Sequence, residues 1–145
     1  MILRAANPGD AKATGAILSA FVAATDWMPK LHSRNEDIGF CRAMIERGWM
    51  RVAEDETGVT GFIARNDCEV NALYVATETQ GRGIGSALIR EAQAKCARLT
   101  LWTFQDNLGA RRFYAQHGFF EIARSDGQTT DEKLPDVQLE WQRQA

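Results

Sequence analysis

The sequence of 145 residues is poor in the side chains that build metal centres and disulfide frameworks. It contains two histidines and three cysteines, and Cys41, Cys68 and Cys96 form no CxxC pair. An odd cysteine count, in a chain without a signal-like start, predicts reduced thiols. Because potential metal ligands are few and scattered, we expect no metal site.

A long apolar run and an excess of positive charge are also missing. No apolar stretch approaches the roughly 20 residues that cross a bilayer, and the formal net charge is −2. We therefore expect neither a membrane nor a nucleic acid as a partner. The start of the sequence has no basic and apolar targeting segment, which favours a cytoplasmic location.

Length and composition are typical of a globular domain. Hydrophobic residues make up 45% of the chain and charged residues 25%, which is ordinary for a protein that buries a core. No internal repeat, low-complexity tract or linker-like segment interrupts the sequence. We therefore expect one domain over residues 1–145.

Hydrophobic periodicity predicts a mixture of strands and helices. Short apolar runs bounded by turn residues indicate strands, and apolar residues at helical spacing indicate helices. The capping box Ser33-x-x-Glu36 marks the start of the second helix. The expected strands cover residues 2–5, 49–54, 59–65, 69–75, 99–104, 119–125 and 136–141. The expected helices follow residues 10 and 33 and begin near residues 84 and 107.

The most informative segment is the glycine-rich loop Gln80-Gly81-Arg82-Gly83-Ile84-Gly85, between an expected strand and an expected helix. Glycine lets the backbone approach a ligand closely, and the free N–H groups at a helix start attract an anion. An NTPase phosphate loop is disfavoured because Gly85-Ser86 lacks the required lysine. A dinucleotide fingerprint is disfavoured because Ser86 occupies the place of its last glycine. Plain helix-entry geometry remains the alternative to a phosphate cradle.

Two motifs resemble the GNAT superfamily of acyl-CoA-dependent N-acetyltransferases. The first is Q-x-x-G-x-G, which begins at Gln80. The second opens a helix at Asn107 and ends with a Phe-Tyr pair at Tyr114, before a Gly-Phe step. The two motifs cover about residues 70–120, and the first 65 residues carry little of the family pattern. For the second motif, an ordinary helix capped by Asn107 and ended by Gly118 is the alternative.

The resemblance implies a fold and a reaction. The implied fold is an α/β (α+β) mixed sheet of the GNAT type, mostly antiparallel and twisted, with about seven strands, splayed strands 4 and 5, and four flanking helices. The implied reaction moves an acetyl group from acetyl-CoA, the expected cosubstrate, directly to a primary amine in a ternary complex. An acyl-CoA-binding regulatory module without turnover and a peptide N-terminal acetyltransferase are the alternatives.

The resemblance also implies which residues hold acetyl-CoA. The backbone N–H of Leu73 would polarise the thioester carbonyl, and the backbone of Val75 would pair with the pantetheine amides. Arg82 would reach a phosphate, although a loop arginine can equally be solvated. The implied cofactor-binding residues are Leu73, Tyr74, Val75, Gln80, Gly81, Arg82, Gly83, Ile84, Gly85, Ser86, Asn107 and Tyr114.

Two side chains are expected to move protons. The phenol of Tyr114 lies at the motif position that donates a proton to the departing thiolate. Glu69 is the candidate general base, because histone-type members of the superfamily carry a glutamate at this offset before Gln80. A strand-edge carboxylate that faces water is the alternative for Glu69.

The acceptor is expected to bind between the first two helices. Trp27 and Met28 would line an apolar pocket there, or else cap the core. His32 would orient the acceptor or act as a base, or else lie on the polar surface. The acceptor would be a small-molecule or peptide amine. The sequence leaves the oligomeric state open, and a homodimer formed through an exposed strand edge is one alternative.

Overall fold

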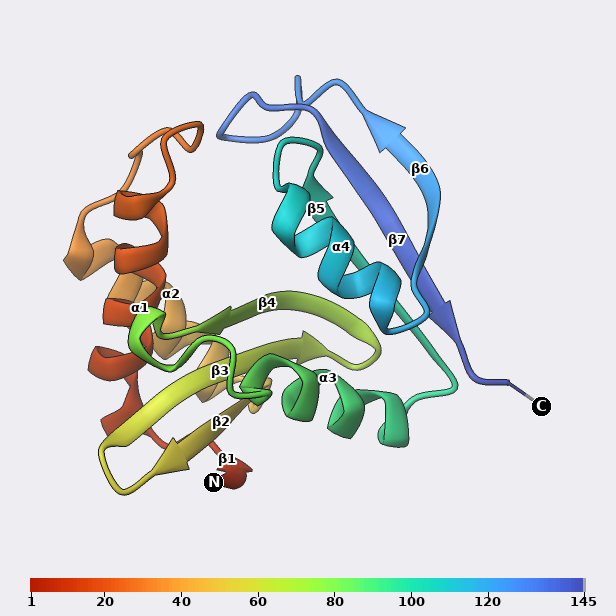
Figure 1. Ribbon diagram of the computed structural model, residues 1–145. Helices are drawn as coiled ribbons and strands as arrows, with labels where there is room; N and C mark the ends of the chain where they lie inside the picture. Colours follow the sequence, from red (N-terminus) through yellow and green to blue (C-terminus); the bar gives the residue numbers. More distant parts are fainter. Residues whose placement is uncertain (145) are drawn as a thin grey trace.

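The computed structural model describes residues 1–144, which form one seven-stranded sheet and four α-helices (Figure 1). The strands are β1 (Ile2–Ala5), β2 (Met50–Asp55), β3 (Gly58–Asn66), β4 (Glu69–Val75), β5 (Arg98–Phe104), β6 (Phe120–Ser125) and β7 (Asp136–Gln142). The helices are α1 (Ala11–Ala24), α2 (Arg34–Glu46), α3 (Ile84–Lys95) and α4 (Leu108–Gln116), and the short 3-10 turns are η1 (Pro8–Asp10) and η2 (Thr77–Thr79). The expected number and order of strands and helices are confirmed.

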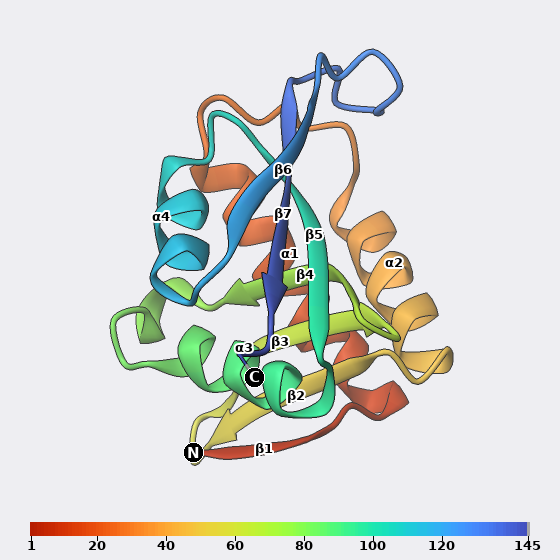
Figure 2. The same ribbon diagram turned by 90° about the vertical axis from the view of Figure 1, so that its right-hand side faces the viewer.

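The strands lie in the order β1-β2-β3-β4-β5-β7-β6. All neighbours are antiparallel except β4 and β5, which are parallel. Figure 2 shows α2 and α4 on opposite sides of the strands. This is the mixed, mostly antiparallel α/β sheet that the sequence predicts.

The parallel pair β4 and β5 separates after two residue pairs. Only Glu69 and Val70 of β4 pair with β5, opposite Thr100 and Leu101. Just beyond, the register between β3 and β4 shifts, so that Asn71 is an extra residue in β4. Such a bulge bends a strand and increases its twist. The rest of β4 therefore diverges from β5, and Figure 1 shows the two halves of the sheet opening here.

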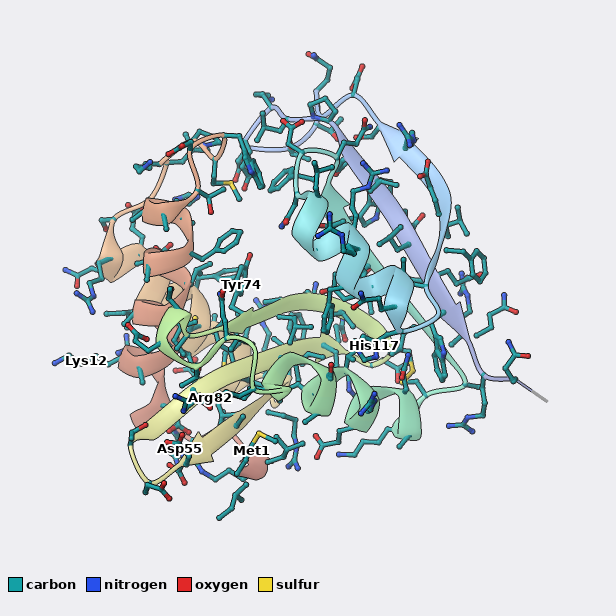
Figure 3. The ribbon with its side chains drawn as sticks, viewed as in Figure 1. Met1, Lys12, Asp55, Tyr74, Arg82 and His117 are labelled. Carbon is teal, nitrogen blue, oxygen red and sulfur yellow. A yellow bond between two sulfur atoms is a disulfide. The ribbon has the colours of Figure 1, made fainter. Side chains whose placement is uncertain are left out.

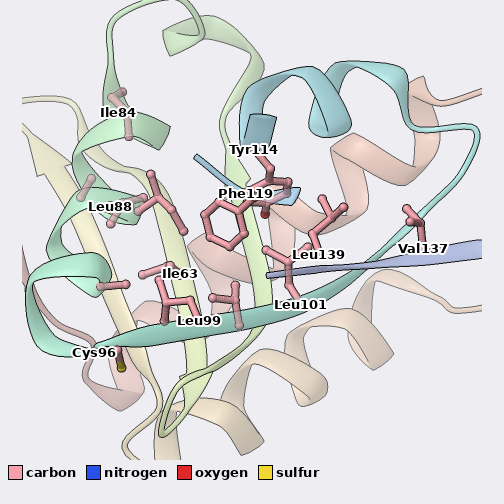
Figure 4. Packing of buried hydrophobic residues seen from close by; sticks show 14 residues of the cluster. Ile63, Ile84, Leu88, Cys96, Leu99, Leu101, Tyr114, Phe119, Val137 and Leu139 are labelled. Carbon is pink, nitrogen blue, oxygen red and sulfur yellow. The ribbon is translucent and has the colours of Figure 1, made fainter. Parts of the chain in front are cut away.

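Two hydrophobic clusters, one on each face of the sheet, hold the layers together. The first joins α3 and α4 to the sheet through fully buried side chains such as Leu88, Leu99 and Val137 (Figure 4). The second joins α1 and α2 to the sheet and includes Cys41 and Phe62. Burial of each such large side chain stabilises the fold by roughly 1.5–3 kcal/mol.

Helix ends follow the local signals of the sequence. The hydroxyl of Ser33 accepts from the N–H of Glu36 at 3.1 Å, and the Glu36 carboxylate accepts from the N–H of Ser33 at 2.9 Å. This reciprocal pair is the expected capping box at the start of α2. Gly118 follows α4 with φ of 86°, a left-handed conformation that costs glycine little.

The cysteines correct one expectation. Cys68 and Cys96 are joined by a disulfide, whereas Cys41 is free and buried. The prediction of reduced thiols is therefore wrong for two of the three cysteines. The disulfide links the turn between β3 and β4 to the C-terminal end of α3. Because its two cysteines are 28 residues apart in the sequence, no local sequence pattern indicates the pairing.

Within residues 1–144, none of the helices is both long and apolar enough to cross a membrane. This part of the chain also holds no group of three or more His, Cys, Asp or Glu side chains arranged around a common point. The cell compartment stays a prediction.

Candidate functional site

A cavity of about 490 Å³ lies where β4 leaves β5. It is bounded by β4, by the glycine loop and first turn of α3, by α4, and by one residue of α1. Its lining residues are Phe21, Leu73, Tyr74, Val75, Thr79, Gln80, Gly81, Gly83, Ile84, Gly85, Ser86, Asn107, Gly109, Ala110, Phe113 and Tyr114. The structure thus brings the two sequence motifs together at one cavity, here called the acyl cavity.

Arg82 is the one expected cofactor-binding residue outside this lining. Its side chain is exposed. Figure 3 shows it beside the turn that carries Asp55. Thr57 lowers the pKa of Asp55 through hydrogen bonds, and the positive charge of Arg82 lowers it further. Arg82 therefore lies at the rim, on the side of the β2–β3 turn.

The glycine loop presents free backbone N–H groups to the acyl cavity. Gly81 and Gly83 have φ of 81° and 79°, which L side chains rarely adopt. The first hydrogen bond of α3 runs from the N–H of Ala87 to the carbonyl of Gly83 at 3.0 Å. The N–H groups before Ala87 have no helical partner, and the helix dipole adds positive potential there. Such an arrangement of N–H groups can hold an anion such as a pyrophosphate.

Tyr114 closes the opposite wall of the acyl cavity. The side chain is buried, with its ring centroid 5.2 Å from those of Phe113 and Phe119. Burial raises the pKa of Tyr114 well above its ordinary value. The phenol therefore keeps its proton at neutral pH and can donate it.

Asn107 serves both as a helix cap and as a cavity residue. Its carboxamide oxygen accepts from the N–H of Ala110 at 3.1 Å, which caps α4. The cap uses only the oxygen, so the side-chain NH₂ group remains available as a donor at the cavity wall. The helix-cap interpretation is confirmed, and it is compatible with ligand binding.

Glu69 lies at the start of β4, before the strands separate. It is exposed and lines neither the acyl cavity nor the second cavity described below. Its nearest polar contact is the side-chain NH₂ of Asn71, 3.5 Å from Oε1. The catalytic role of Glu69 stays a prediction, and this placement does not support it.

A second cavity, of about 730 Å³, opens on the α1 and α2 side of the sheet. Met28 and His32, two of the three expected acceptor-binding residues, line it, and their binding role stays a prediction. Trp27 lies behind this wall, with its ring centroid 5.8 Å from that of Phe104, which is itself a lining residue. We call this space the acceptor cavity, after the acceptor that is expected to bind near these residues. It adjoins the acyl cavity, since Tyr74 lines both cavities.

Tyr74 stands between the two cavities. Figure 3 shows its side chain rising from β4 into the space beside α1. Its ring packs against Phe21 and Phe62, with centroids 5.1 Å and 5.7 Å away. Burial raises the pKa of Tyr74 to about 12, and the negative charge of Glu132 adds to that effect. The phenol therefore stays neutral where the two cavities meet.

Several site residues were missed by the sequence motifs. Phe21 of α1 and Phe113 of α4 line the acyl cavity. Asp37 of α2, Trp102 of β5 and Glu132 of the β6–β7 loop line the acceptor cavity. Only Phe113 had a local signal, since it adjoins Tyr114 within the second motif. The others reach the site through tertiary packing.

Comparisons with known proteins agree with this geometry. A curated relative, the 5-NmdU N-acetyltransferase of Pseudomonas phage PaMx11, is 36% identical over 93 residues, which are 59% of this chain. The match covers 66% of that relative, so the chain spans slightly less than two thirds of its length.

Solved structures show the same fold over the whole chain. YjaB from Escherichia coli, solved in its apo form, has a TM-score of 0.82 with 24% identity and covers 99% of this chain and 100% of its own. The yncA protein of Salmonella typhimurium, solved with its cofactor acetyl-CoA, has a TM-score of 0.76 with 20% identity, over 100% of this chain and 95% of its own. At these identities the likeness establishes the fold.

The family to which the chain belongs is shown by a match to a family of known domains. The family described as the acetyltransferase (GNAT) domain matches residues 18–121. This segment spans most of the chain and contains both sequence motifs, all lining residues of the acyl cavity and most of those of the acceptor cavity. The chain therefore belongs to the GNAT acetyltransferase family.

Proposed function

We propose that this protein is an N-acetyltransferase that transfers the acetyl group of acetyl-CoA directly to a primary amine. The observation that carries the proposal is the acyl cavity. There the free N–H groups of the glycine loop, the open edge of β4 and the protonated phenol of Tyr114 line one space. These are the groups that a pyrophosphate, a pantetheine arm and a departing thiolate each need.

The open edge of β4 is suited to bind the pantetheine arm. The N–H of Ala76 donates to the carbonyl of Thr60 in β3 at 2.8 Å. Because successive residues of a strand turn their backbone groups to opposite sides, those of Val75 and Leu73 face the side that β5 has left. An extended amide chain can add to this edge like another strand.

The proposed chemistry needs few side chains. Acetyl-CoA supplies the acetyl group as a thioester, whose C–S bond breaks as the new C–N bond forms. The backbone N–H of Leu73 polarises the carbonyl. Tyr114 donates its proton to the departing sulfur, and the proton lost by the amine returns through solvent to the phenolate. Asn107 donates from its side-chain NH₂ to the pantetheine arm, and Arg82 remains a candidate phosphate ligand at the rim.

The acceptor cavity favours an enzyme over a binding module without turnover. A regulatory acyl-CoA-binding module needs the acyl cavity alone, whereas a transferase needs a second space that opens beside the thioester. Tyr74 lines both spaces, so the two cavities adjoin at this residue. Small-molecule amines and peptide N-termini both remain candidate acceptors.

The proposal is tested by thiol release from acetyl-CoA with pools of small amines, aminoglycosides and short peptides, against a blank without acceptor. Release above the blank, with an acetylated product found by mass spectrometry, is the expected result. Binding of acetyl-CoA without release from any pool would instead favour the regulatory module. The oligomeric state stays a prediction and can be read in parallel by size-exclusion chromatography with light scattering.

A further inference from the structure

The acceptor cavity combines carboxyl groups with aromatic and aliphatic walls. Its acidic lining residues are Glu36, Asp37, Asp131 and Glu132. They come from α2 and from the β6–β7 loop, two segments that face each other across the cavity. Among the described residues, no lysine or arginine lines this cavity. Within residues 1–144, the one basic lining residue is His32, whose Nδ1 lies 3.8 Å from Oε2 of Glu36, so acidic side chains outnumber basic ones in this wall.

Asp37 is the most buried of the four acidic residues in this wall. It is only 7% exposed. The hydroxyl of Ser19 donates to its Oδ2 at 2.5 Å, but Asp37 forms no ion pair within the part of the chain that the structure describes. A buried carboxylate is costly unless a positive charge or several donors compensate it. A cationic ligand in the acceptor cavity would supply that compensation.

Exposed apolar side chains gather at the same cavity. Leu31, Phe40 and Trp102 are 48%, 51% and 45% exposed, and all three are lining residues. Apolar side chains grouped at a surface hollow mark a ligand site more often than scattered ones do. Aromatic rings also attract ammonium groups through their π faces. The wall thus matches a ligand that has both methylene groups and positive charge.

The acidic groups lie close to the proposed point of acetyl transfer, but the nitrogen that they can bind as a cation is not the one that attacks the thioester. Glu132 and Asp37 both act electrostatically on the Tyr74 phenol, which stands between the two cavities. The nitrogen that attacks the thioester must be neutral, because a protonated amine has no lone pair. A nitrogen held as a cation by Asp37 is therefore a second nitrogen of the same acceptor.

We propose, on the basis of the proposed function, that the acceptor is an aliphatic amine with a second, positively charged nitrogen a few methylenes from the reacting one. This is the chemistry of a diamine or a linear polyamine. The charged nitrogen lies against Asp37 and the acidic loop residues, the methylenes contact Leu18, Val22 and Met28, and the neutral nitrogen meets the acetyl group beside Tyr74.

The test compares acceptors that differ only in the second charge. Thiol release is measured with 1,4-diaminobutane, with n-pentylamine, which replaces the second nitrogen by a carbon, and with 5-aminopentanoate, which replaces it by a carboxylate. We expect kcat/KM for the diamine to exceed that for the monoamine by about tenfold or more, since tenfold corresponds to about 1.4 kcal/mol. The amino acid should be the poorest acceptor. Equal kcat/KM for the diamine and the monoamine would overturn this inference and leave the proposed function intact.

Asp37→Asn is the matching variant, because asparagine keeps the size of the side chain and can still accept from Ser19. It should lower kcat/KM for the diamine about tenfold, and by clearly more than that for the monoamine. Glu132→Gln, in the loop, should act in the same direction without touching the core. Glu46→Gln is the control, since Glu46 is exposed on the same helix outside the cavity. An equal loss for both amines in the two cavity variants would contradict the inference.

Direct binding separates this inference from the proposed function. Titration calorimetry with 1,4-diaminobutane, with and without CoA, reports the acceptor cavity even if turnover is absent. Binding to the wild type that weakens in Asp37→Asn, together with no thiol release, would support the cation site and refute the transferase. Absence of diamine binding under both conditions, with no preference in turnover, would refute the cation site.

Discussion

Phe113 of α4 lies against Gly85 of α3, so that a Cβ atom at position 85 would be 3.3 Å from Cε1 of Phe113 and 3.7 Å from Cγ2 of Val75. The contact joins the glycine loop, β4 and α4 at the acyl cavity. The space left by the missing side chain of Gly85 therefore sets how closely these three elements approach.

Gly85→Ala should weaken acetyl-CoA binding. The added methyl group needs room that Phe113 now fills, so Phe113 has to shift within the cavity wall. We expect the dissociation constant to rise about tenfold, a cost of about 1.4 kcal/mol. Titration calorimetry with acetyl-CoA measures it. Unchanged or tighter binding would show that Gly85 is not needed for the shape of this wall.

Gly15→Ala should destabilise the fold. A Cβ atom on Gly15 would lie 2.7 Å from Cα of Ile38, so α1 and α2 would have to move apart. Overpacking of this kind costs about 1–3 kcal/mol. Gly39→Ala is the matched control, because Gly39 lies within α2 with no atom within 4 Å of an added Cβ. The control should gain roughly 0.5–1 kcal/mol from helix propensity. Chemical denaturation measures both, and equal effects would contradict the close packing.

Reduction should lower the stability of the oxidised protein. The disulfide between Cys68 and Cys96 closes a loop with a sequence separation of 28, for which chain entropy gives about 3–4 kcal/mol. The midpoint of thermal unfolding should fall on addition of dithiothreitol, and a Cys68→Ser/Cys96→Ser variant should not respond. Thiol titration in denaturant should find one free thiol, that of Cys41. Three free thiols in protein purified without reductant would contradict the pairing.

Stability should also fall in mild acid through His117. Burial lowers the pKa of His117, and the positive charge of Arg90 lowers it further. The unfolded chain, with a histidine pKa of about 6.5, then binds more protons than the folded chain. The contribution of neutral His117 to the free energy of unfolding is therefore complete above about pH 6.5. It is lost as the pH falls through the lower pKa of the folded state. His117→Gln should reduce the decline of unfolding free energy between about pH 7 and 5. An unchanged slope would contradict the assignment.

The sequence was informative where structure depends on neighbours along the chain. The glycine loop, the Ser33 capping box and the Asn107 cap are local patterns, and each takes its expected form. Asp37 carries no such pattern, because only the tertiary fold brings it to one cavity with Trp102 and Glu132. The pairing of Cys68 with Cys96 is likewise a tertiary contact.

Glu69 illustrates a second limit. An offset from Gln80 can assign a residue to β4, but it cannot say whether the side chain enters a cavity. The bulge at Asn71 changes the register between Glu69 and the part of β4 that lines the site. A bulge of one residue has no clear sequence signal here, so the sequence could not decide between a cavity-facing and a water-facing Glu69, and the structure shows it exposed.

Proton donation by Tyr114 to the departing thiolate is the chemical step on which the proposed acetyl transfer depends. Its most direct test is thiol release by the wild type and by Tyr114→Phe across pH 6 to about 10, with acetyl-CoA binding measured in parallel. We predict a fall of about 10²-fold in kcat with unchanged binding. The wild type should show no alkaline loss from this phenol below about pH 10, since burial raises its pKa. An unchanged kcat across this range in Tyr114→Phe would contradict the account.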